Sequence, residues 1–246
     1  MKPYRFLFSL LTAFLLYVST ANAEIKIGTV IFDPPFIISL DQGFDIDLIH
    51  ALCKRCSLDC QLVPMDFNQL FPALESGEID AAIGGITITP DRRTRYIFSL
   101  PYVLSKGAFL VLKNSSINSL ADLKGKKIGV LKGEQDSSVF SDYLNQHYPN
   151  VFQSTNYNDV EDIIAALSNN TISAAFVHES TAVYWEQNGG GQFRALGNPM
   201  LVGDGIGIMS LSKNKGLIQQ FNQQIEAMEK DGSYLTLYNT YFGNER

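Results

Sequence analysis

The run IGGITITPDRR, residues 83–93, combines the features of an anion-binding site. We expect a strand to end at Gly84 and Gly85, where the missing side chains let backbone amides approach a ligand. Thr89 is expected to cap a helix that begins at the next residue, which places Arg92 in the first turn beside free amide donors. An arginine and open amides together hold a carboxylate through paired hydrogen bonds. A solvated arginine at a polar helix start is the simpler alternative.

A second loop, LKGEQDS at residues 131–137, has the same position between an expected strand and an expected helix. Its amides are suited to the same anion, approached from the other half of the chain. Many helices begin after a glycine, so this loop alone is only a weak indication of a binding site.

Aromatic side chains follow other strands in the same way. Phe32, Phe36 and Phe67 lie in or beside loops after strands, where aromatic rings commonly sandwich the aliphatic or guanidinium part of a ligand. The alternative is that they belong to the hydrophobic core, as most aromatic residues do.

The sequence lacks the motifs typical of serine hydrolases and of metal sites. The chain has no Gly-x-Ser-x-Gly element and no HExxH, and its histidines, His50, His147 and His178, are scattered. We therefore expect neither a metal nor a cofactor. The formal net charge of −6, with no basic cluster, argues against binding to nucleic acid or to anionic lipid.

The three cysteines, Cys53, Cys56 and Cys60, fall in one short window. A structural disulfide across a helix end is the preferred interpretation, with one thiol left unpaired. A redox Cys-x-x-Cys pair is an alternative, although that motif normally opens a helix and here it closes one. A zinc site is weaker still, because His50 is the only nearby imidazole.

The first residues predict export from the cytoplasm. Lys2 and Arg5 precede an apolar run, residues 6–18, and a small-x-small signature ends at Ala23. This pattern is typical of a signal peptide over residues 1–23, cleaved after Ala23. An uncleaved anchor is the alternative, but the run is short for a bilayer span.

Behind these loops, strands and helices alternate twice along the chain. Apolar periodicity predicts strands at 25–31, 61–65 and 79–83, with helices at 44–56 and 68–76 between them. A second series begins after Asn114, and it predicts helices at 120–123, 137–147, 160–167 and 179–187 and strands at 127–131, 153–157 and 173–177. Such alternation is typical of α/β units with parallel sheets and crossover helices.

The C-terminal part cannot close a core alone, because it offers one expected strand, 205–211, and two amphipathic helices, 215–229 and 234–241. It must dock onto one of the two α/β units. We therefore expect two lobes joined by a two-strand hinge, with crossings near 104–109 and 204–207. Lobe 1 would comprise residues 24–107 and 207–246, and lobe 2 residues 108–206. Glycines at both crossings suit strands that bend as the lobes close.

Several of these segments, in this order, resemble the polar amino-acid-binding proteins of ABC importers, and most closely their arginine and lysine/arginine/ornithine branch. The matching segments are GFDIDL at 43–48, FPALESG at 71–77, GITITPDR at 85–92, FSLPY at 98–102, LADLKG at 120–125 and DGSY at 231–234. No single segment is decisive, but together they cover nearly the whole exported chain.

The resemblance implies a two-lobed periplasmic binding protein that closes on its ligand. It implies that Arg92 holds the ligand carboxylate and that Cys53 and Cys60 form a disulfide, leaving Cys56 free. The other ligand contacts that it implies are the hydroxyl and amide of Thr87, the ring of Phe67, the backbone of Gly84 and Gly85, and Gln135.

The chain departs from this family where the ligand's charges are bound. His178 replaces the aspartate that usually pairs with the ligand ammonium, so either Glu179 substitutes for it or His178 binds differently. Asp33 matches a stacking tyrosine, and it offers a negative charge suited to a cationic side chain.

We therefore predict a monomeric periplasmic protein that captures an amino acid, with arginine or another cationic or polar one expected, for an ABC permease. One alternative is a periplasmic dehydratase of the cyclohexadienyl dehydratase type, in which Glu179 acts as the general acid. A ligand-sensing receptor is the other alternative.

Overall fold

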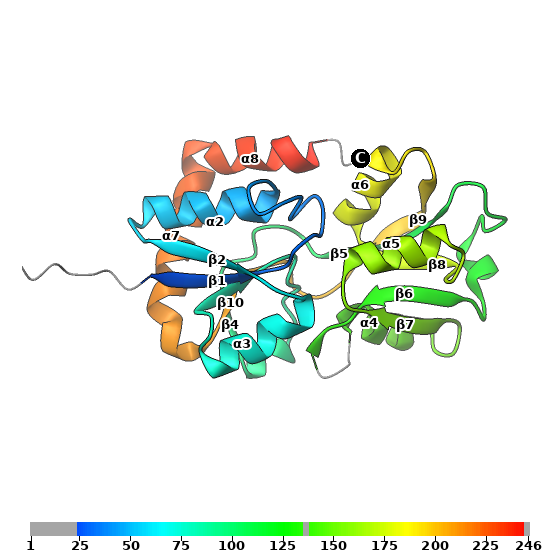
Figure 1. Ribbon diagram of the computed structural model, residues 1–246, viewed down its shortest axis with the longest axis horizontal. Coiled ribbons are helices and arrows are strands. Elements are labelled where there is room, and N and C mark those ends of the chain that lie inside the picture. Colours follow the sequence, from blue (N-terminus) through cyan, green and yellow to red (C-terminus); the bar gives the residue numbers. More distant parts are fainter. Residues whose placement is uncertain (1–23, 135–137, 244–246) are drawn as a thin grey trace, which may run out of the picture.

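The computed structural model describes residues 24–134 and 138–243, so the expected signal peptide and Gln135 lie outside the described residues. The described chain forms two α/β lobes, each built on its own five-stranded sheet (Figure 1). The expected two-lobed α/β fold is confirmed. Within the described ranges, no helix is both long enough and apolar enough to cross a membrane.

The first lobe is built on the sheet β2-β1-β3-β10-β4. Its central strand β1 runs parallel to β2 and β3, while β10 runs antiparallel to β3 and β4. Parallel neighbours require crossover connections, which helices α2 and α3 provide. The bounds of these elements are β1 Ile25–Thr29, α2 Phe44–Arg55, β2 Cys60–Pro64, α3 Leu70–Ser76, β3 Ala81–Ile83, β4 Ile97–Phe98 and β10 Met209–Ser210.

Helix α2 begins where the chain turns sharply at Gly43, whose φ is 143°. A Cβ there would lie 2.2 Å from the carbonyl oxygen of Phe36, so only glycine fits this close approach. The helix then buries its apolar stripe, which includes Phe44, Leu48 and Leu52, in the core of the first lobe. The start of α2 is thereby fixed beside the loop that follows β1.

The C-terminal helices α7 (Lys215–Asp231) and α8 (Ser233–Phe242) dock on the first lobe, as expected, beside α2 (Figure 1). Phe44 is fully buried, and the centroid of its ring lies 4.7 Å from that of Phe242. Its ring also meets those of Tyr234 and Tyr238 nearly at right angles, a favourable geometry for aromatic pairs. This aromatic cluster fastens the end of the chain to the lobe in which it began.

The second lobe is built on the sheet β7-β6-β8-β5-β9. Strand β6 runs parallel to β7 and β8, and β5 runs antiparallel to β8 and β9. Helices α4, α5 and α6 connect these strands. The bounds are β5 Lys106–Leu112, β6 Lys127–Leu131, α4 Val139–His147, β7 Gln153–Tyr157, α5 Val160–Ser168, β8 Ala174–His178, α6 Glu179–Asn188 and β9 Phe193–Leu201.

Three expectations about local structure are corrected. The sequence pattern missed β9, which contains Gly197 and Pro199 and lies at a sheet edge, where proline is tolerated. The strand expected at 205–211 pairs as β10 only at its two residues 209–210. The helix expected from Pro90 is instead a short 3₁₀ turn at Arg92–Thr94. Its first turn nevertheless receives the expected cap, because the hydroxyl of Thr89 accepts from the Arg92 amide at 3.2 Å.

Two chain segments join the lobes, between β4 and β5 and between β9 and β10. They run side by side, since the Ile206 amide donates to the Val103 carbonyl at 2.8 Å and the Val202 amide donates to the Ser105 carbonyl at 2.9 Å. Gly205 has a φ of 107°, a region that glycine alone enters easily. The exact lobe boundaries at residues 107 and 207 stay a prediction.

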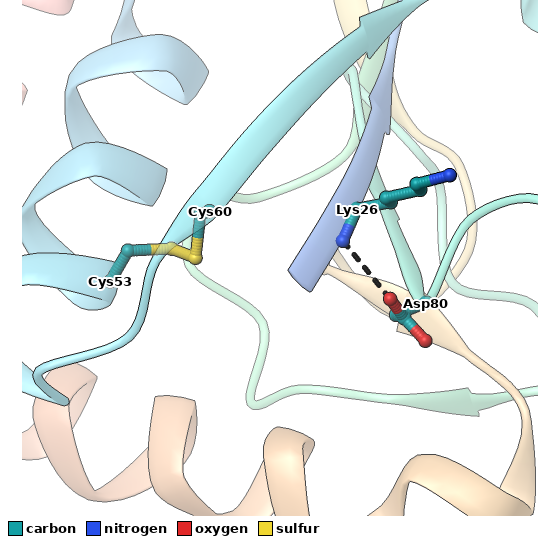
Figure 2. Close-up of a disulfide and its surroundings, with 4 residues drawn as sticks. All are labelled: Lys26, Cys53, Cys60 and Asp80. Carbon is teal, nitrogen blue, oxygen red and sulfur yellow. Dashed lines mark hydrogen bonds between the residues drawn. A yellow bond between two sulfur atoms is a disulfide. The ribbon is translucent and has the colours of Figure 1, made fainter. Parts of the chain in front are cut away.

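A disulfide joins Cys53, near the end of α2, to Cys60, the first residue of β2 (Figure 2). Cys56 is half-buried and not bonded to either. Figure 2 also shows Lys26 of β1, whose backbone amide donates to the Asp80 carboxylate at 3.0 Å and so ties β1 to the residue before β3. The expected structural disulfide is therefore confirmed, and the alternative redox pair between Cys53 and Cys56 is not formed.

Removing this disulfide by the double substitution Cys53→Ser/Cys60→Ser is expected to destabilise the protein. The disulfide joins residues seven apart, so it removes about 2–3 kcal/mol of chain entropy from the unfolded state. In a chain of this size that corresponds to a fall in melting temperature of about 5–10 °C, measurable by calorimetry. The matched control, Cys56→Ser, should melt within about 1 °C of the unaltered protein. If the double variant has the same melting temperature as the control, the disulfide does not stabilise the protein.

Candidate functional site

A cavity of about 120 Å³ lies between the two lobes. From the first lobe it is lined by residues 30–33, which follow β1, and by residues 65–67, which follow β2. From the second lobe it is lined by Leu131, the last residue of β6, and by residues 158–161 at the start of α5. Pockets for drug-sized ligands enclose roughly 300–1,000 Å³, so this cavity suits a smaller solute.

The lining of this cavity is acidic at its polar positions. It includes Asp33, Asp66, Asp159 and Glu161, and no lysine, arginine or histidine among the described residues. The remaining lining is largely apolar, with Val30, Phe32, Met65, Phe67 and Leu131. A carboxylate-rich, partly apolar pocket favours a solute that carries positive charge on an apolar stem.

Asp33 is the most buried of these acids, with 3% of its surface exposed. A tight turn holds it, because its backbone amide and carbonyl both bond to Ile37 at 2.9 Å. Its Oδ1 accepts a hydrogen bond from the hydroxyl of Thr181, in α6 of the other lobe, at 2.9 Å. Burial raises the pKa of Asp33 to about 7, while the Thr181 hydrogen bond opposes that rise.

Arg92 is also buried, and its Nη1 donates to the Thr87 carbonyl at 2.7 Å. Its guanidinium carbon lies 5.0 Å from the centroid of the Phe71 ring and 5.8 Å from that of Phe67, so both rings stabilise its charge. Burial lowers the pKa of Arg92 to about 10, and nearby Glu134 opposes that fall, so the side chain remains protonated at neutral pH.

Arg92 itself lines a second hollow between the lobes, of about 380 Å³. The second lobe contributes Glu134, Asp142 and Tyr143 to this hollow, among other residues. Phe67 lines the acidic cavity and also contacts Arg92, so it links the two hollows. The Phe67 ring thus contacts the buried Arg92 cation and also forms part of the wall of the acidic cavity.

The backbone at Gly85 is used within the protein rather than left open for a ligand. Its amide donates to Asp45 Oδ2 at 2.9 Å, and the same oxygen accepts from the Tyr102 hydroxyl at 3.0 Å. Its carbonyl bonds to Nε2 of His178 at 2.8 Å. Gly84, with a φ of 152°, packs against Val30. These glycines shape the loop after β3, and the expectation that their backbone contacts a ligand stays a prediction.

His178 lies at the end of β8 and is buried. Because a carbonyl oxygen only accepts, the bond to Gly85 places a proton on Nε2. Burial lowers the pKa of His178 to about 4, so the ring is neutral at physiological pH. His178 therefore carries no charge toward the cavity, and it does not line the cavity.

Three other predicted site residues have different surroundings from those expected. The carboxylate of Glu179 forms a salt bridge with Lys106 at 2.9 Å, because α6 starts beside β5. Phe36 is fully buried in the core of the first lobe, and its ring packs on Phe242. The Thr87 hydroxyl is within 2.9 Å of the Ser105 hydroxyl. None of the three residues lines the acidic cavity.

Sequence reasoning missed several residues of this site. Thr181, Asp45 and the lining acids Asp66, Asp159 and Glu161 were not singled out. A signal existed for Asp159, whose side chain accepts from the Asp162 amide at 2.7 Å as the cap of α5. Thr181 could not be found in this way, because its role depends on contact between two lobes.

Comparison with known proteins identifies relatives of this chain. Residues 25–244 match the family model described as bacterial extracellular solute-binding proteins, family 3. The chain is 30% identical over 241 residues to ABC transporter arginine-binding protein 1 of Escherichia coli, covering 95% of this chain and 96% of that protein. It is 31% identical over 232 residues to the histidine-binding periplasmic protein of the same species, covering 89% of this chain and 87% of that protein.

The fold has similar solved structures. The periplasmic binding protein of an arginine transport system from Legionella pneumophila superposes with a TM-score of 0.83 at 34% identity, covering 89% of this chain and 99% of that one.

Proposed function

This chain belongs to the bacterial extracellular solute-binding proteins of family 3, and we propose on that basis that it captures one amino acid between its lobes. The proposal extends to delivery of that amino acid to a membrane ABC permease, as a single chain without a cofactor. The observation that carries the proposal is the acidic cavity between the lobes, with a buried arginine beside its aromatic wall.

The charges of the cavity favour a cationic amino acid. Arg92 supplies a fork of N–H donors that suits a carboxylate. Asp66, Asp159 and Glu161 supply negative charge from both lobes for a positively charged side chain. The apolar lining between them suits the methylene groups of such a side chain. L-arginine is therefore the first candidate and L-histidine the second, in line with the relatives' names.

The enzyme alternative receives less support. A dehydratase would require Glu179 as a general acid within reach of the substrate. Glu179 is instead paired with Lys106 and does not line the cavity. The relatives reported above are named as binding proteins.

We further propose that residues 1–23 direct export and are removed, which places the protein in the periplasm. The disulfide between Cys53 and Cys60 supports an oxidising compartment. N-terminal sequencing of the exported protein tests this, with Glu24 expected as the first residue. An intact N-terminus on the exported protein would contradict cleavage.

Ligand screening by thermal shift tests the function. The chain from Glu24 would be melted with each of the twenty amino acids and with ornithine. A ligand present at a hundredfold excess over its dissociation constant adds about 2.7 kcal/mol of stability, which is several degrees for this chain. Arginine, histidine, lysine or ornithine should give the largest shift. A shift only with acidic or apolar amino acids would contradict the cationic assignment.

Neutralising the lining acids should weaken arginine binding selectively. Asp66→Asn and Glu161→Gln each remove a partly solvated carboxylate, so each should raise the dissociation constant for arginine about two- to fivefold. Binding of neutral glutamine should change less than twofold. Calorimetry measures both, with Glu226→Gln, an exposed acid on α7 outside the cavity, as the control. Equal losses for arginine and glutamine would show that these acids do not contact a cationic side chain.

A further inference from the structure

The carboxylate of Asp33 and the ring of His178 meet at Gly85. A Cβ placed on Gly85 would lie 3.3 Å from Asp33 Oδ2 and 3.5 Å from His178 Nε2. Asp33 comes from the first lobe, in the turn after β1, and His178 comes from the second lobe, at the end of β8. The two side chains therefore face the same point of the loop after β3 from opposite lobes.

Only one of these two groups can hold a cation. The proton on Nε2 of His178 is directed to the Gly85 carbonyl, and the neutral ring carries no charge. Asp33 lines the acidic cavity, whereas His178 does not. A buried ammonium group needs a negative partner once water is expelled. Of the two groups that meet at Gly85, Asp33 is the one that can provide this negative charge.

Asp33 and Arg92 approach the same loop after β3, Asp33 from the acidic cavity and Arg92 from the second hollow. Arg92 bonds to the carbonyl of Thr87, and Asp33 faces Gly85. Gly85 and Thr87 are two residues apart, so their Cα atoms are separated by at most about 7 Å. A positive and a negative side chain thus approach one short loop segment from two directions. This arrangement suits the adjacent carboxylate and ammonium groups of a zwitterion.

Asp33 also has a partner across the interface between the lobes. Its Oδ1 accepts from the hydroxyl of Thr181, which is fully buried in the first turn of α6. This hydrogen bond exists only while the lobes are together, because its two residues come from different lobes. A hydroxyl that donates to a carboxylate favours the ionised form, the form that pairs with an ammonium group.

We propose that Asp33 binds the α-ammonium group of the ligand, and that Thr181 acts as a positioning residue that holds the Asp33 carboxylate when the lobes close. This inference rests on the proposed function, since it assigns the ammonium subsite of the same cavity. The negative partner of the ligand ammonium group would then belong to the first lobe. Thr181, from the second lobe, would link binding of the ligand to closure of the two lobes.

The assignment predicts a proton linkage. Because burial raises the pKa of Asp33 to about 7, cation binding below that pH requires loss of a proton. The dissociation constant should therefore rise by up to about tenfold per pH unit below 7 and level off above it. The other titratable groups near Asp33 are His178, whose ring is neutral in this range, and Asp45, whose pKa is also raised to about 7, mainly by burial and in part by the charge of Asp33. The Asp45 carboxylate accepts from the Gly85 amide and the Tyr102 hydroxyl and does not line the cavity. The acids lining the same cavity are Asp66, Asp159 and Glu161.

The test compares two probes that differ only in the α-ammonium group, L-arginine and 5-guanidinopentanoate. Calorimetry gives both dissociation constants for the unaltered protein, for Asp33→Asn and for Asp66→Asn. The unaltered protein should prefer arginine by about 10- to 100-fold, the value of a hydrogen-bonded charge. Asp33→Asn should reduce that preference to within about threefold and weaken the pH dependence between pH 5.5 and 8, leaving only the contribution of Asp45. Asp66→Asn should keep both the preference and the pH dependence, because its charge faces the side chain.

Thr181 is tested by two substitutions with opposite expectations. Thr181→Val removes the hydroxyl at nearly constant volume and should lower the preference for arginine about three- to tenfold. Thr181→Ser keeps the hydroxyl and should restore the preference to within about twofold of the unaltered protein. Equal losses in both variants would show that packing, not the hydroxyl, matters, and would overturn this role.

The outcomes distinguish the inference from the function on which it rests. If the unaltered protein binds arginine and Asp33→Asn keeps both the preference and the pH dependence, the assignment of Asp33 is overturned while the function stands. If Asp33→Asn weakens both probes equally, Asp33 contacts the side chain instead, and the assignment also falls. If the unaltered protein binds neither arginine nor any other amino acid, the proposed function fails, and the inference fails with it.

Discussion

Replacement of Arg92 by alanine is expected to abolish measurable binding of amino acids. Truncating one partner of a buried, hydrogen-bonded charge pair costs about 2–5 kcal/mol. That range corresponds to a loss of affinity of about 30-fold to several thousand-fold. Arg92 is suited to this role because the rings of Phe67 and Phe71 and the Thr87 carbonyl hold its guanidinium group in place. Titration calorimetry with L-arginine measures the loss.

Two companion variants separate the ligand role of Arg92 from its structural role. Arg93→Ala removes the same charge from the next residue, whose half-exposed side chain lies 3.8 Å from Asp204, and should bind as the unaltered protein does. Arg92→Lys keeps the charge without the fork of donors and should bind with intermediate affinity. If Arg92→Ala folds and binds arginine within a few-fold of the unaltered protein, Arg92 does not hold the ligand.

Replacement of Phe44 by alanine is expected to have the largest effect on stability. Phe44 is fully buried and lies at the centre of the aromatic cluster formed with Tyr102, Tyr234, Tyr238, Tyr241 and Phe242. Deleting a buried phenylalanine ring costs about 3–5 kcal/mol, because contacts are lost and a cavity remains. For this chain that lowers the melting temperature by about 6–20 °C, measurable by scanning calorimetry.

Leu235→Ala, on the C-terminal helix α8 that packs against Phe44, serves as the control. Leu235 is 59% exposed, so its truncation should change the melting temperature by less than about 2 °C. If Phe44→Ala melted no lower than Leu235→Ala, α8 would not be fastened to the first lobe through this cluster.

The alternating elements could be predicted because their apolar patterns are regular. The apolar positions of α2 recur at helical spacing, and β1, β3, β6 and β8 are short apolar runs bounded by polar residues or glycine. The edge strand β9 escaped prediction, because only its pairing with β5 makes the run FRALGNPML a strand. The turn at Arg92–Thr94 could not be told from a helix start, since both begin with the same capping residues.

The functional site was less predictable than the fold. Arg92, Phe67 and Asp33 could be singled out, because charged and aromatic residues in loops after strands are conspicuous. The environments of Glu179 and His178 could not be read from the sequence, because Lys106 and Gly85, their partners, come from distant segments. Asp45 looks like an ordinary acidic residue at the start of a helix, yet it holds the Gly85 amide. Contacts across a sheet or between lobes leave no local pattern.

The proposed function requires that the protein capture an amino acid between its lobes and leave it chemically unaltered. The most direct test is a calorimetric titration of the chain from Glu24 with L-arginine at pH 7.5, followed by recovery of the ligand from the denatured complex. We predict saturable binding of one arginine per chain and recovery of arginine chemically unchanged. Absence of saturable heat with arginine and with every other amino acid, or recovery of a converted product, would contradict the account.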